Sequence, residues 1–409
     1  MNTSDLEKRL TLQQKKLDLV LQLTQAINLN FSHQSLLNIY QYVIAKELGV
    51  GLFLLLMRDT QNEWEVAACS QENYRQYPKN IDLRFKHITQ NTVLEPTVQT
   101  DFKEFSHIIP VINDKKALAY VLIGKLQWAD GNTIKEMVDF MQALTNILVI
   151  ANENRKFFDA AIEQEKLKND LQLAKRIQTM LVPENLPDTA ALKASAVYIP
   201  NRTVGGDYYD CQQISETEWI FCVADVTGKG ISAALLMANL QANLRFMMQE
   251  TDDLTQIVTQ INKKTILNTR ADRFVTLFIA KLNTQTGTLT YINAGHTPPL
   301  LYQNETIEFL KTGSPLLGIL DHLPFINTGT AQLENDALLL IFTDGLSEIK
   351  NKQNQEFDTE ALSQFAHANN RLPINQFNQK LVQSMIDYQD GNTDFADDVT
   401  ILSLKYFKN

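Results

Sequence analysis

The sequence predicts a mixed α+β protein with more than one domain. Short apolar runs typical of strands occur together with helical segments, but without the regular strand–helix alternation of a parallel sheet, so largely antiparallel sheets are expected. A segment without proline or glycine, residues 142–181, separates two such regions. With 409 residues, the chain is also longer than a single hydrophobic core usually serves.

The charge and cysteine content exclude several classes of protein. The chain has 37 basic and 47 acidic residues, and a net charge of −10 is the wrong sign for binding nucleic acid through its phosphates. Its three cysteines form no CxxC pair and are too few for a disulfide framework. Its first residues lack the apolar core of a signal peptide, and no apolar run is long enough to span a membrane. We therefore expect a cytoplasmic protein whose partners are metal ions and proteins.

The N-terminal region has the pattern of a sheet flanked by helices. Apolar residues recur at helical spacing from Leu6 to Leu48, with an interruption at residues 28–32, which predicts two helices. Further elements are expected as two strands, a hairpin and a helix, at Leu52–Met57, Glu65–Ala68, Ile108–Ile112 with Ala117–Ile123, and from about Asn132. In topology this order resembles a GAF sensory domain, which implies a small-molecule or protein signal at this domain.

Residues 142–181 are rich in strong helix formers and predict one long helix that ends before Pro183 and Pro187. Its apolar residues form two consecutive stripes, Leu144, Ile147, Ala151, Phe158 and Ile162, then Leu167, Leu171, Ala174, Ile177 and Leu181. A second copy of the helix would bury these stripes in a coiled coil, which predicts a homodimer. The alternative is that the helix packs on its own domain. The expected domains are a sensor at 1–148, a helical linker at 149–186 and a third domain at 187–409.

The C-terminal region predicts antiparallel sheets covered by helices. The expected strands are Ala194–Ile199, Trp219–Val223, Phe274–Leu282, Thr288–Asn293, Leu338–Phe342 and Thr400–Leu404. The expected helices are Ser232–Met248, Leu254–Asn268, Thr359–Ala368 and Ile374–Tyr388.

Four aspartates lie at the ends of these apolar runs, two of them, Asp207 and Asp344, next to glycine: Asp207, Asp225, Asp344 and Asp397. If the strands bring them to one end of a sheet, their combined negative charge requires cations. Oxygen ligands without a Cys or His cluster favour Mg²⁺ or Mn²⁺ over zinc. Two such ions that share a carboxylate and a water can activate hydroxide for attack on phosphorus, so phosphoester hydrolysis is the expected reaction.

Seven blocks in order carry a family resemblance: VGGDYYD, VADVTGKGISAALL, RFVTLFIAKL, INAGHTPPLL, GSPLLGIL, FTDGLSE and DDVTILSL. From about Gln172 to Leu404 the chain resembles the bacterial type 2C metal-dependent serine/threonine phosphatases, in their sporulation and stress-sigma-regulator branch. The resemblance implies an αββα sandwich with two Mn²⁺ or Mg²⁺ ions between the sheets. It also implies that Asp225 bridges both ions, that Asp207 and the Val226 carbonyl join it, and that Asp344 and Asp397 complete the second site.

Several assignments near these motifs have alternatives. Asp398 competes with Asp397 as the ligand, although the first position of this pair is the ligand in the family pattern. Arg202 is placed to pair with a phosphate, or is simply solvated. His296 is a candidate proton donor to the leaving alkoxide, or shapes the loop before Pro298. Asp210 and Glu348 are supporting or surface groups.

The resemblance implies a dimeric signalling phosphatase that removes phosphate from a phosphoserine or phosphothreonine of an anti-anti-sigma-type regulator. The N-terminal sensor would act through the linker and the helix Ser232–Met248 on the metal site. The alternative is a catalytically silent scaffold that binds such a regulator.

Overall fold

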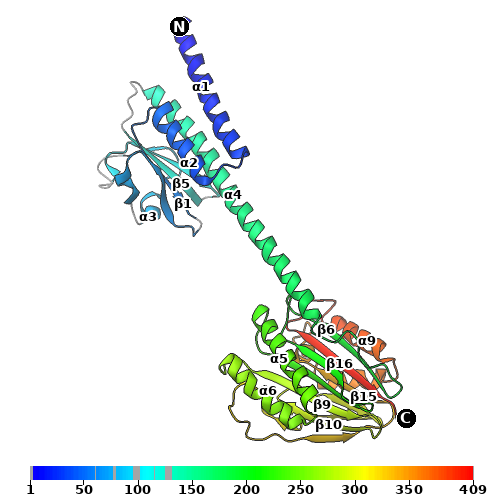
Figure 1. The fold of residues 1–409 in the computed structure, drawn as a ribbon. Coiled ribbons are helices and arrows are strands. Elements are labelled where there is room, and N and C mark those ends of the chain that lie inside the picture. The colour runs from blue at the N-terminus through cyan, green and yellow to red at the C-terminus, as the bar shows by residue number, and fades with distance from the viewer. Residues whose placement is uncertain are drawn as a thin grey trace. The chain divides into compact units, whose positions relative to one another are not determined.

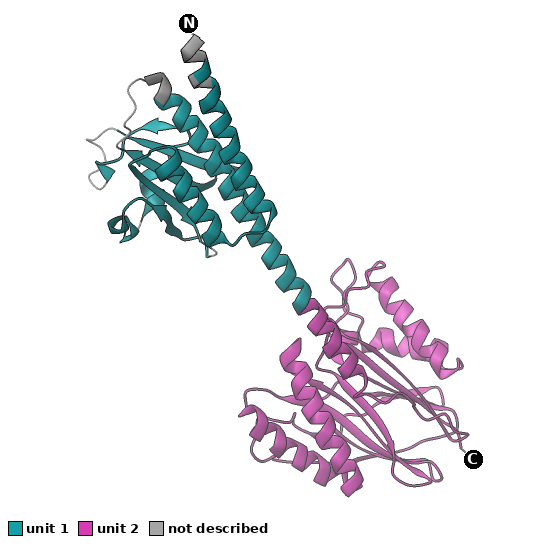
Figure 2. Ribbon diagram, turned by 45° about the horizontal axis from the view of Figure 1, so that its top comes forward, with its two compact units in different colours: residues 1–166 teal, residues 167–409 magenta. Residues whose placement is uncertain are grey.

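The computed structural model describes residues 3–59, 61–76, 80–94, 102–114, 116–124 and 131–408. Two compact units are present, residues 1–166 and residues 167–409 (Figure 2). The boundary between them falls inside one long helix, α4 (Gly131–Thr179), which includes most of the helix expected from sequence. The three-part division at 148 and 186 stays a prediction. Within the described ranges, no helix combines the length and apolar character needed to cross a membrane.

The first unit has a five-stranded antiparallel sheet in the order β2-β1-β5-β4-β3. Its strands are β1 (Leu52–Arg58), β2 (Trp64–Cys69), β3 (Thr92–Val93), β4 (His107–Asn113) and β5 (Lys116–Gly124). Its helices are α1 (Thr3–Asn28), α2 (His33–Tyr42), α3 (Ile81–Phe85), a π-helical turn (Val43–Glu47), a 3₁₀ turn (Glu72–Gln76) and the first part of α4. The predicted helices, strands and hairpin of this region are confirmed, whereas β3, α3 and the 3₁₀ turn were not predicted.

Strand β1 is apolar from Leu52 to Met57 because both faces of this sheet are covered. Phe53 and Leu55 pack into the core beneath α1, α2 and α4. Leu52 and Leu54 pack into a second, aromatic core on the opposite face. Side chains alternate across a strand, so a continuous apolar run is the pattern of a strand buried on both sides. The sheet flanked by helices is confirmed, and its assignment as a GAF domain stays a prediction.

The second unit contains two antiparallel sheets. One has the order β13-β10-β9-β8-β7, with β14 also paired to β10, and the other has the order β12-β11-β15-β16-β6. A single pair, β10 with β13, is parallel. The strands are β6 (Leu192–Ile199), β7 (Tyr208–Gln213), β8 (Glu218–Val226), β9 (Val275–Asn283), β10 (Thr288–Ala294), β11 (Leu300–Gln303), β12 (Thr306–Phe309), β13 (Gly313–Ser314), β14 (Gly329–Gln332), β15 (Ala337–Phe342) and β16 (Val399–Tyr406).

The two sheets pack face to face and each is covered by helices on its outer side (Figure 1). Helices α5 (Ile231–Glu250) and α6 (Leu254–Thr269) cover the first sheet. Helices α8 (Thr359–Asn369) and α9 (Ile374–Tyr388) cover the second, and a short α7 (Asp344–Ser347) follows β15. The predicted αββα sandwich is confirmed, as are the six strands and four helices expected in this region.

Alternation along the strands decides which side chains face the layer between the sheets. On β8, Phe221 and Val223 pack into the inter-sheet core, while Cys222 and Ala224 pack under α5 and α6. The same alternation places Asp225 on the inter-sheet side near the end of this strand. Thus the strands deliver polar residues at their ends into the space between the two sheets.

Truncation of Leu402 to Ala tests the inter-sheet core. Leu402 is fully buried on β16 between the sheets. Its truncation should lower the free energy of unfolding of this unit by about 2–5 kcal/mol, because it leaves a cavity. The matched change Leu267→Ala, on a side chain that is 71% exposed, should shift it by less than about 0.5 kcal/mol. Urea unfolding followed by tryptophan fluorescence measures both, and equal effects would contradict this account of the core.

Candidate metal centre

Asp207 lies at the buried end of the inter-sheet layer, in the turn before β7. It is 2% exposed, and its Oδ2 accepts hydrogen bonds from two hydroxyls of the other sheet. Thr343 Oγ1 lies 2.8 Å away and Thr400 Oγ1 lies 2.6 Å away. The two threonines are joined to each other, because the Thr400 backbone N–H donates to Thr343 Oγ1 at 2.9 Å. This network fixes one carboxylate oxygen of Asp207 and leaves Oδ1 for another ligand.

The other three predicted aspartates surround this position at different depths. Asp225 is half-buried on β8, within hydrogen-bonding reach of Asp207. Asp344 is exposed at the start of α7, and Asp397 is half-buried just before β16. The centre therefore has a deep pair, Asp207 and Asp225, and a rim pair, Asp344 and Asp397.

Burial and mutual repulsion raise the pKa values of three of these carboxylates. Burial, followed by the charge of Asp225, holds the pKa of Asp207 well above its usual range. Burial and then the charge of Asp344 raise the pKa of Asp225 to about 7. Partial desolvation and then Asp397 raise the pKa of Asp344. Each group is thus destabilised in its charged form by its neighbours, which is the condition that bound cations relieve.

Asp397 and Asp398 have different surroundings. Asp398 is buried, and its two oxygens accept backbone hydrogen bonds from Gly206 (2.6 Å) and Asn201 (2.8 Å). Asp397 instead faces the rim, where its Oδ2 lies 2.9 Å from Lys229 Nζ. Asp398 therefore holds the loop that carries Asp207, and this arrangement favours Asp397 as the ligand of the pair.

Glycines beside the aspartates allow close approach of other groups. A Cβ on Gly205 would collide with the Asp398 carboxylate, and one on Gly345 would collide with the Asp398 carbonyl. A Cβ on Gly206 would lie 2.6 Å from the Val226 carbonyl oxygen. Hence Gly206 brings this predicted carbonyl ligand next to the turn of Asp207.

Gln178, in the last turn of α4, contacts the same turn. Its Nε2 donates to the Gly205 carbonyl at 2.7 Å, and its Oε1 accepts from the Gly205 backbone N–H at 3.2 Å. Sequence reasoning missed Gln178, Thr343 and Thr400. The two threonines stand within the FTDG and DDVT blocks, which was the available signal, whereas Gln178 lies in a helix full of similar polar residues.

The remaining candidates lie in distinct places. Arg202 is exposed beside Gly230, near Lys229. Asp210 is buried on the helix side of the first sheet, where Arg245 Nε of α5 lies 2.7 Å from its Oδ2. Glu348 is exposed near the rim, where desolvation and then Asp344 raise its pKa.

His296 is 5% exposed, and burial lowers its pKa to about 4. A buried neutral imidazole fits the loop-shaping alternative for His296 better than proton donation.

The oxygen atoms that these residues offer are the ligands that hard divalent cations prefer. All four predicted side chains supply carboxylate oxygens, and the Val226 carbonyl adds a fifth donor of the same kind. Among the residues that the structure describes, no three acidic, His or Cys side chains are gathered closely enough to hold an ion as they stand. In this arrangement Asp397 is turned to Lys229, and Oδ2 of Asp207 is turned to Thr343 and Thr400.

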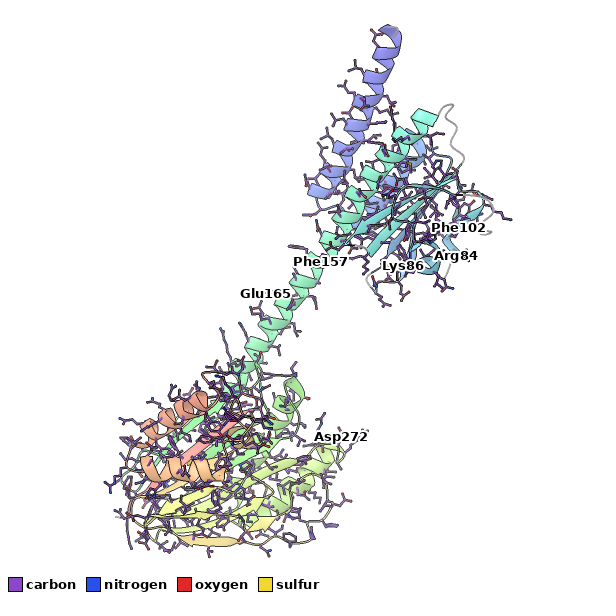
Figure 3. The ribbon with its side chains drawn as sticks, turned by 180° about the vertical axis from the view of Figure 1, so that it is seen from behind. Arg84, Lys86, Phe102, Phe157, Glu165 and Asp272 are labelled. Atoms are coloured by element: carbon purple, nitrogen blue, oxygen red, sulfur yellow. The ribbon has the colours of Figure 1, made fainter. Side chains whose placement is uncertain are left out.

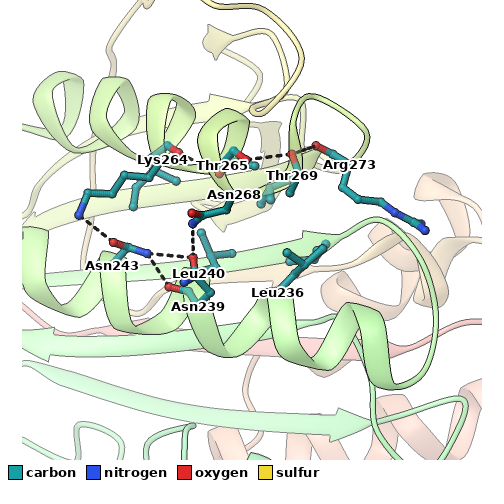
Figure 4. Close-up of a pocket in the computed structure, with 12 residues that line it drawn as sticks. Leu236, Asn239, Leu240, Asn243, Lys264, Thr265, Asn268, Thr269 and Arg273 are labelled. Carbon is teal, nitrogen blue, oxygen red and sulfur yellow. Dashed lines mark hydrogen bonds between the residues drawn. The ribbon is translucent and has the colours of Figure 1, made fainter.

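Helix α5, which begins soon after Asp225, is held on α6 by a polar network (Figure 4). Lys264 Nζ donates to Asn243 Oδ1 at 2.8 Å, and Asn268 Nδ2 donates to Asn239 Oδ1 at 2.7 Å. The cavity between these helices has a volume of about 20 Å³, enough for one water. It lies on the helix side of the first sheet and is too small for a substrate.

Comparison with known proteins places this fold in a family. Residues 215–407 match the family model of stage II sporulation protein E (SpoIIE). This part of the chain is a SpoIIE-type domain. The second unit also shares its fold with the SiaA-PP2C domain of Pseudomonas aeruginosa, with a TM-score of 0.55 and 19% identity over 60% of this chain and 99% of that one.

Two relatives are similar to this chain over more residues than the family model covers. Protein IcfG of Synechocystis is 23% identical over 325 residues, which cover 72% of this chain and 51% of IcfG. Phosphoserine phosphatase RsbU of Bacillus subtilis is 26% identical over 244 residues, 59% of this chain and 71% of RsbU. The chain thus spans about half the length of IcfG. The predicted branch of the type 2C family is confirmed.

Replacement of the two adjacent aspartates by Ala separates their roles. Asp398→Ala leaves the N–H groups of Gly206 and Asn201 without their acceptor, so the free energy of unfolding should fall by about 3 kcal/mol or more. Asp397→Ala removes a partly exposed ion pair and should cost about 1 kcal/mol or less, while abolishing binding of one Mn²⁺. Urea unfolding and calorimetric Mn²⁺ titration measure the two effects. The reverse pattern would make Asp398 the ligand.

Proposed function

We propose that this chain is a metal-dependent protein serine/threonine phosphatase. The observation that carries the proposal is that four carboxylates from both sheets lie around one end of the inter-sheet layer, where burial and mutual repulsion raise the pKa values of Asp207, Asp225 and Asp344. Asp207, Asp225, Asp344, Asp397 and the Val226 carbonyl would hold two Mn²⁺ or Mg²⁺ ions. When bound, such ions supply an activated water and neutralise charge on the phosphate.

Basic side chains at the rim support a phosphorylated substrate. Lys229 reaches the rim, and the guanidinium groups of Arg202 and Arg273 lie beside Gly230 and Gly228 in the same loop. Guanidinium groups bind phosphate oxygens in pairs. These residues would hold the phosphate and orient it toward the carboxylate centre. We infer a phosphoserine or phosphothreonine protein of the anti-anti-sigma type as the substrate, by analogy with the family branch.

The linker offers a route for regulation. Helix α4 exposes large apolar side chains: Ile150, Phe157, Phe158, Ile162, Leu167, Leu173 and Ile177. Phe157, labelled in Figure 3, is 73% exposed. A second copy of α4 would bury this surface in a coiled-coil homodimer. The GAF-like first unit would then alter α4, which bonds Gly205 through Gln178 and so reaches the turn of Asp207, while α5 adjoins Asp225.

Asp225→Asn tests the catalytic proposal. The variant should hydrolyse a phosphoserine protein or an aryl phosphate at least about 100-fold more slowly than wild type with Mn²⁺, since loss of even a supporting contact typically costs 10–100-fold. The matched control is Asp188→Asn, whose carboxylate is 81% exposed and which should leave the rate unchanged. A chelator should abolish activity and Mn²⁺ should restore it. Full activity in Asp225→Asn would contradict the proposal.

The double change Phe158→Glu with Ile162→Glu tests the dimer. Buried charge in a coiled-coil seam is costly, so the variant should be a monomer by light scattering where wild type is a dimer. Ala160→Glu adds a charge on the opposite face of the helix, where Ala160 is exposed, and should leave the dimer intact. A monomeric wild type, or a dimeric double variant, would overturn this part of the proposal.

A further inference from the structure

His296 lies where the chain passes from the first sheet of the SpoIIE-type domain to the second. It follows β10, and Pro298 and Pro299 lead from it into β11. Its backbone N–H donates to Asn293 Oδ1 at 2.8 Å, which fixes the loop around it. Its imidazole is 5% exposed, so the ring is enclosed by protein on both sides.

The two ring nitrogens face different sheets. Nδ1 lies 2.9 Å from Thr276 Oγ1 on β9 of the first sheet. The ring also faces the carbonyl of Phe342 at the end of β15 in the second sheet, and the nitrogen left for it is Nε2. Nε2 has no partner of standard hydrogen-bond geometry among the described residues. The tautomer that suits these surroundings carries its proton on Nε2, on the side of the Phe342 carbonyl, and leaves Nδ1 to accept from the Thr276 hydroxyl.

The two residues that face the ring, Thr276 and Phe342, lie next to predicted metal ligands. Thr276 is the cross-strand partner of Asp225 in the β8–β9 pair, and their side chains lie on the same face. Phe342 lies two residues before Asp344. His296 therefore lies beside the two strand ends that carry Asp225 and Asp344. The charges of these two carboxylates repel each other, and a side chain that contacts both strand ends would oppose their separation.

We propose that His296 is a positioning residue, an imidazole brace between the sheets that sets the spacing of Asp225 and Asp344 and thereby the affinity for divalent cations. Its burial keeps the ring neutral at physiological pH, so each nitrogen has one fixed role. A protonated ring would direct a second N–H at Thr276 and enclose a charge without a counter-ion. The inference rests on the proposed metal centre, and it replaces proton donation as the role of His296.

His296→Phe tests the brace in the full-length protein, because it keeps a ring and removes both polar contacts. Mn²⁺ binding, measured by calorimetry and by the electron paramagnetic resonance signal of free Mn²⁺, should weaken at least about tenfold, the typical effect of losing a group that supports metal ligands. Excess Mn²⁺ should restore most of the activity. His322→Phe, at an exposed histidine of the same unit, is the control and should bind Mn²⁺ like wild type.

Thr276→Val provides a second variant that keeps the imidazole and removes only its Nδ1 partner. It should weaken Mn²⁺ binding in the same direction but by less, and it decides the question if His296→Phe does not fold. Folded His296→Phe with wild-type Mn²⁺ affinity would overturn the brace, and so would Thr276→Val with unchanged affinity where His296→Phe does not fold. Proton donation would instead remove the basic limb of the pH profile of kcat without changing Mn²⁺ affinity. If wild type itself binds no Mn²⁺, the proposed metal centre fails, which is a separate outcome.

Discussion

The buried carboxylate of Asp207 sets the main constraint on the second unit. A charged group at 2% exposure is stable only if its oxygens are bonded and its charge is balanced. The second sheet meets the first requirement with the hydroxyls of Thr343 and Thr400. Because these donors come from one sheet and the carboxylate from the other, the sheets must approach closely at this end. Gly205 and Gly345, where no Cβ would fit beside Asp398, are consequences of that approach.

Local sequence patterns predicted the strands that carry the aspartates, but not the hydrogen bonds that hold these aspartates in place. The strands that end near the aspartates are apolar runs, so their positions follow from periodicity, and the αββα layers followed from the family blocks. The bonds from Thr343 and Thr400 to Asp207 join residues 136 and 193 positions apart. Gln178 contacts a loop 27 residues away through the backbone of Gly205. A single sequence has no periodic signal for such pairs, since they exist only after the sheets pack.

The strands of the second unit that were not predicted from sequence have two physical causes. Strand β7 carries the polar run Asp210 to Gln213, which lacks the apolar alternation of a half-buried strand. Strands β11, β12 and β14 have four residues each and β13 has two. Segments this short have too little intrinsic preference to specify a strand and gain their stability from pairing with longer neighbours. Strand β10, for example, pairs with β9, β13 and β14.

The two halves of the carboxylate centre differ in how firmly they are fixed. Asp207 is held by buried hydrogen bonds, which cost about 1.5–3 kcal/mol each to lose when one partner is charged. Asp397 faces Lys229 across a partly exposed pair, and such pairs contribute about 1 kcal/mol or less. In the proposed centre an ion at the rim must also displace or share this ammonium group. Small movements of the loop that carries Lys229 therefore change the rim site at much lower free-energy cost than the deep site. That loop leads directly into α5, so the helix through which regulation is proposed to arrive is joined to the weaker site as well as to Asp225.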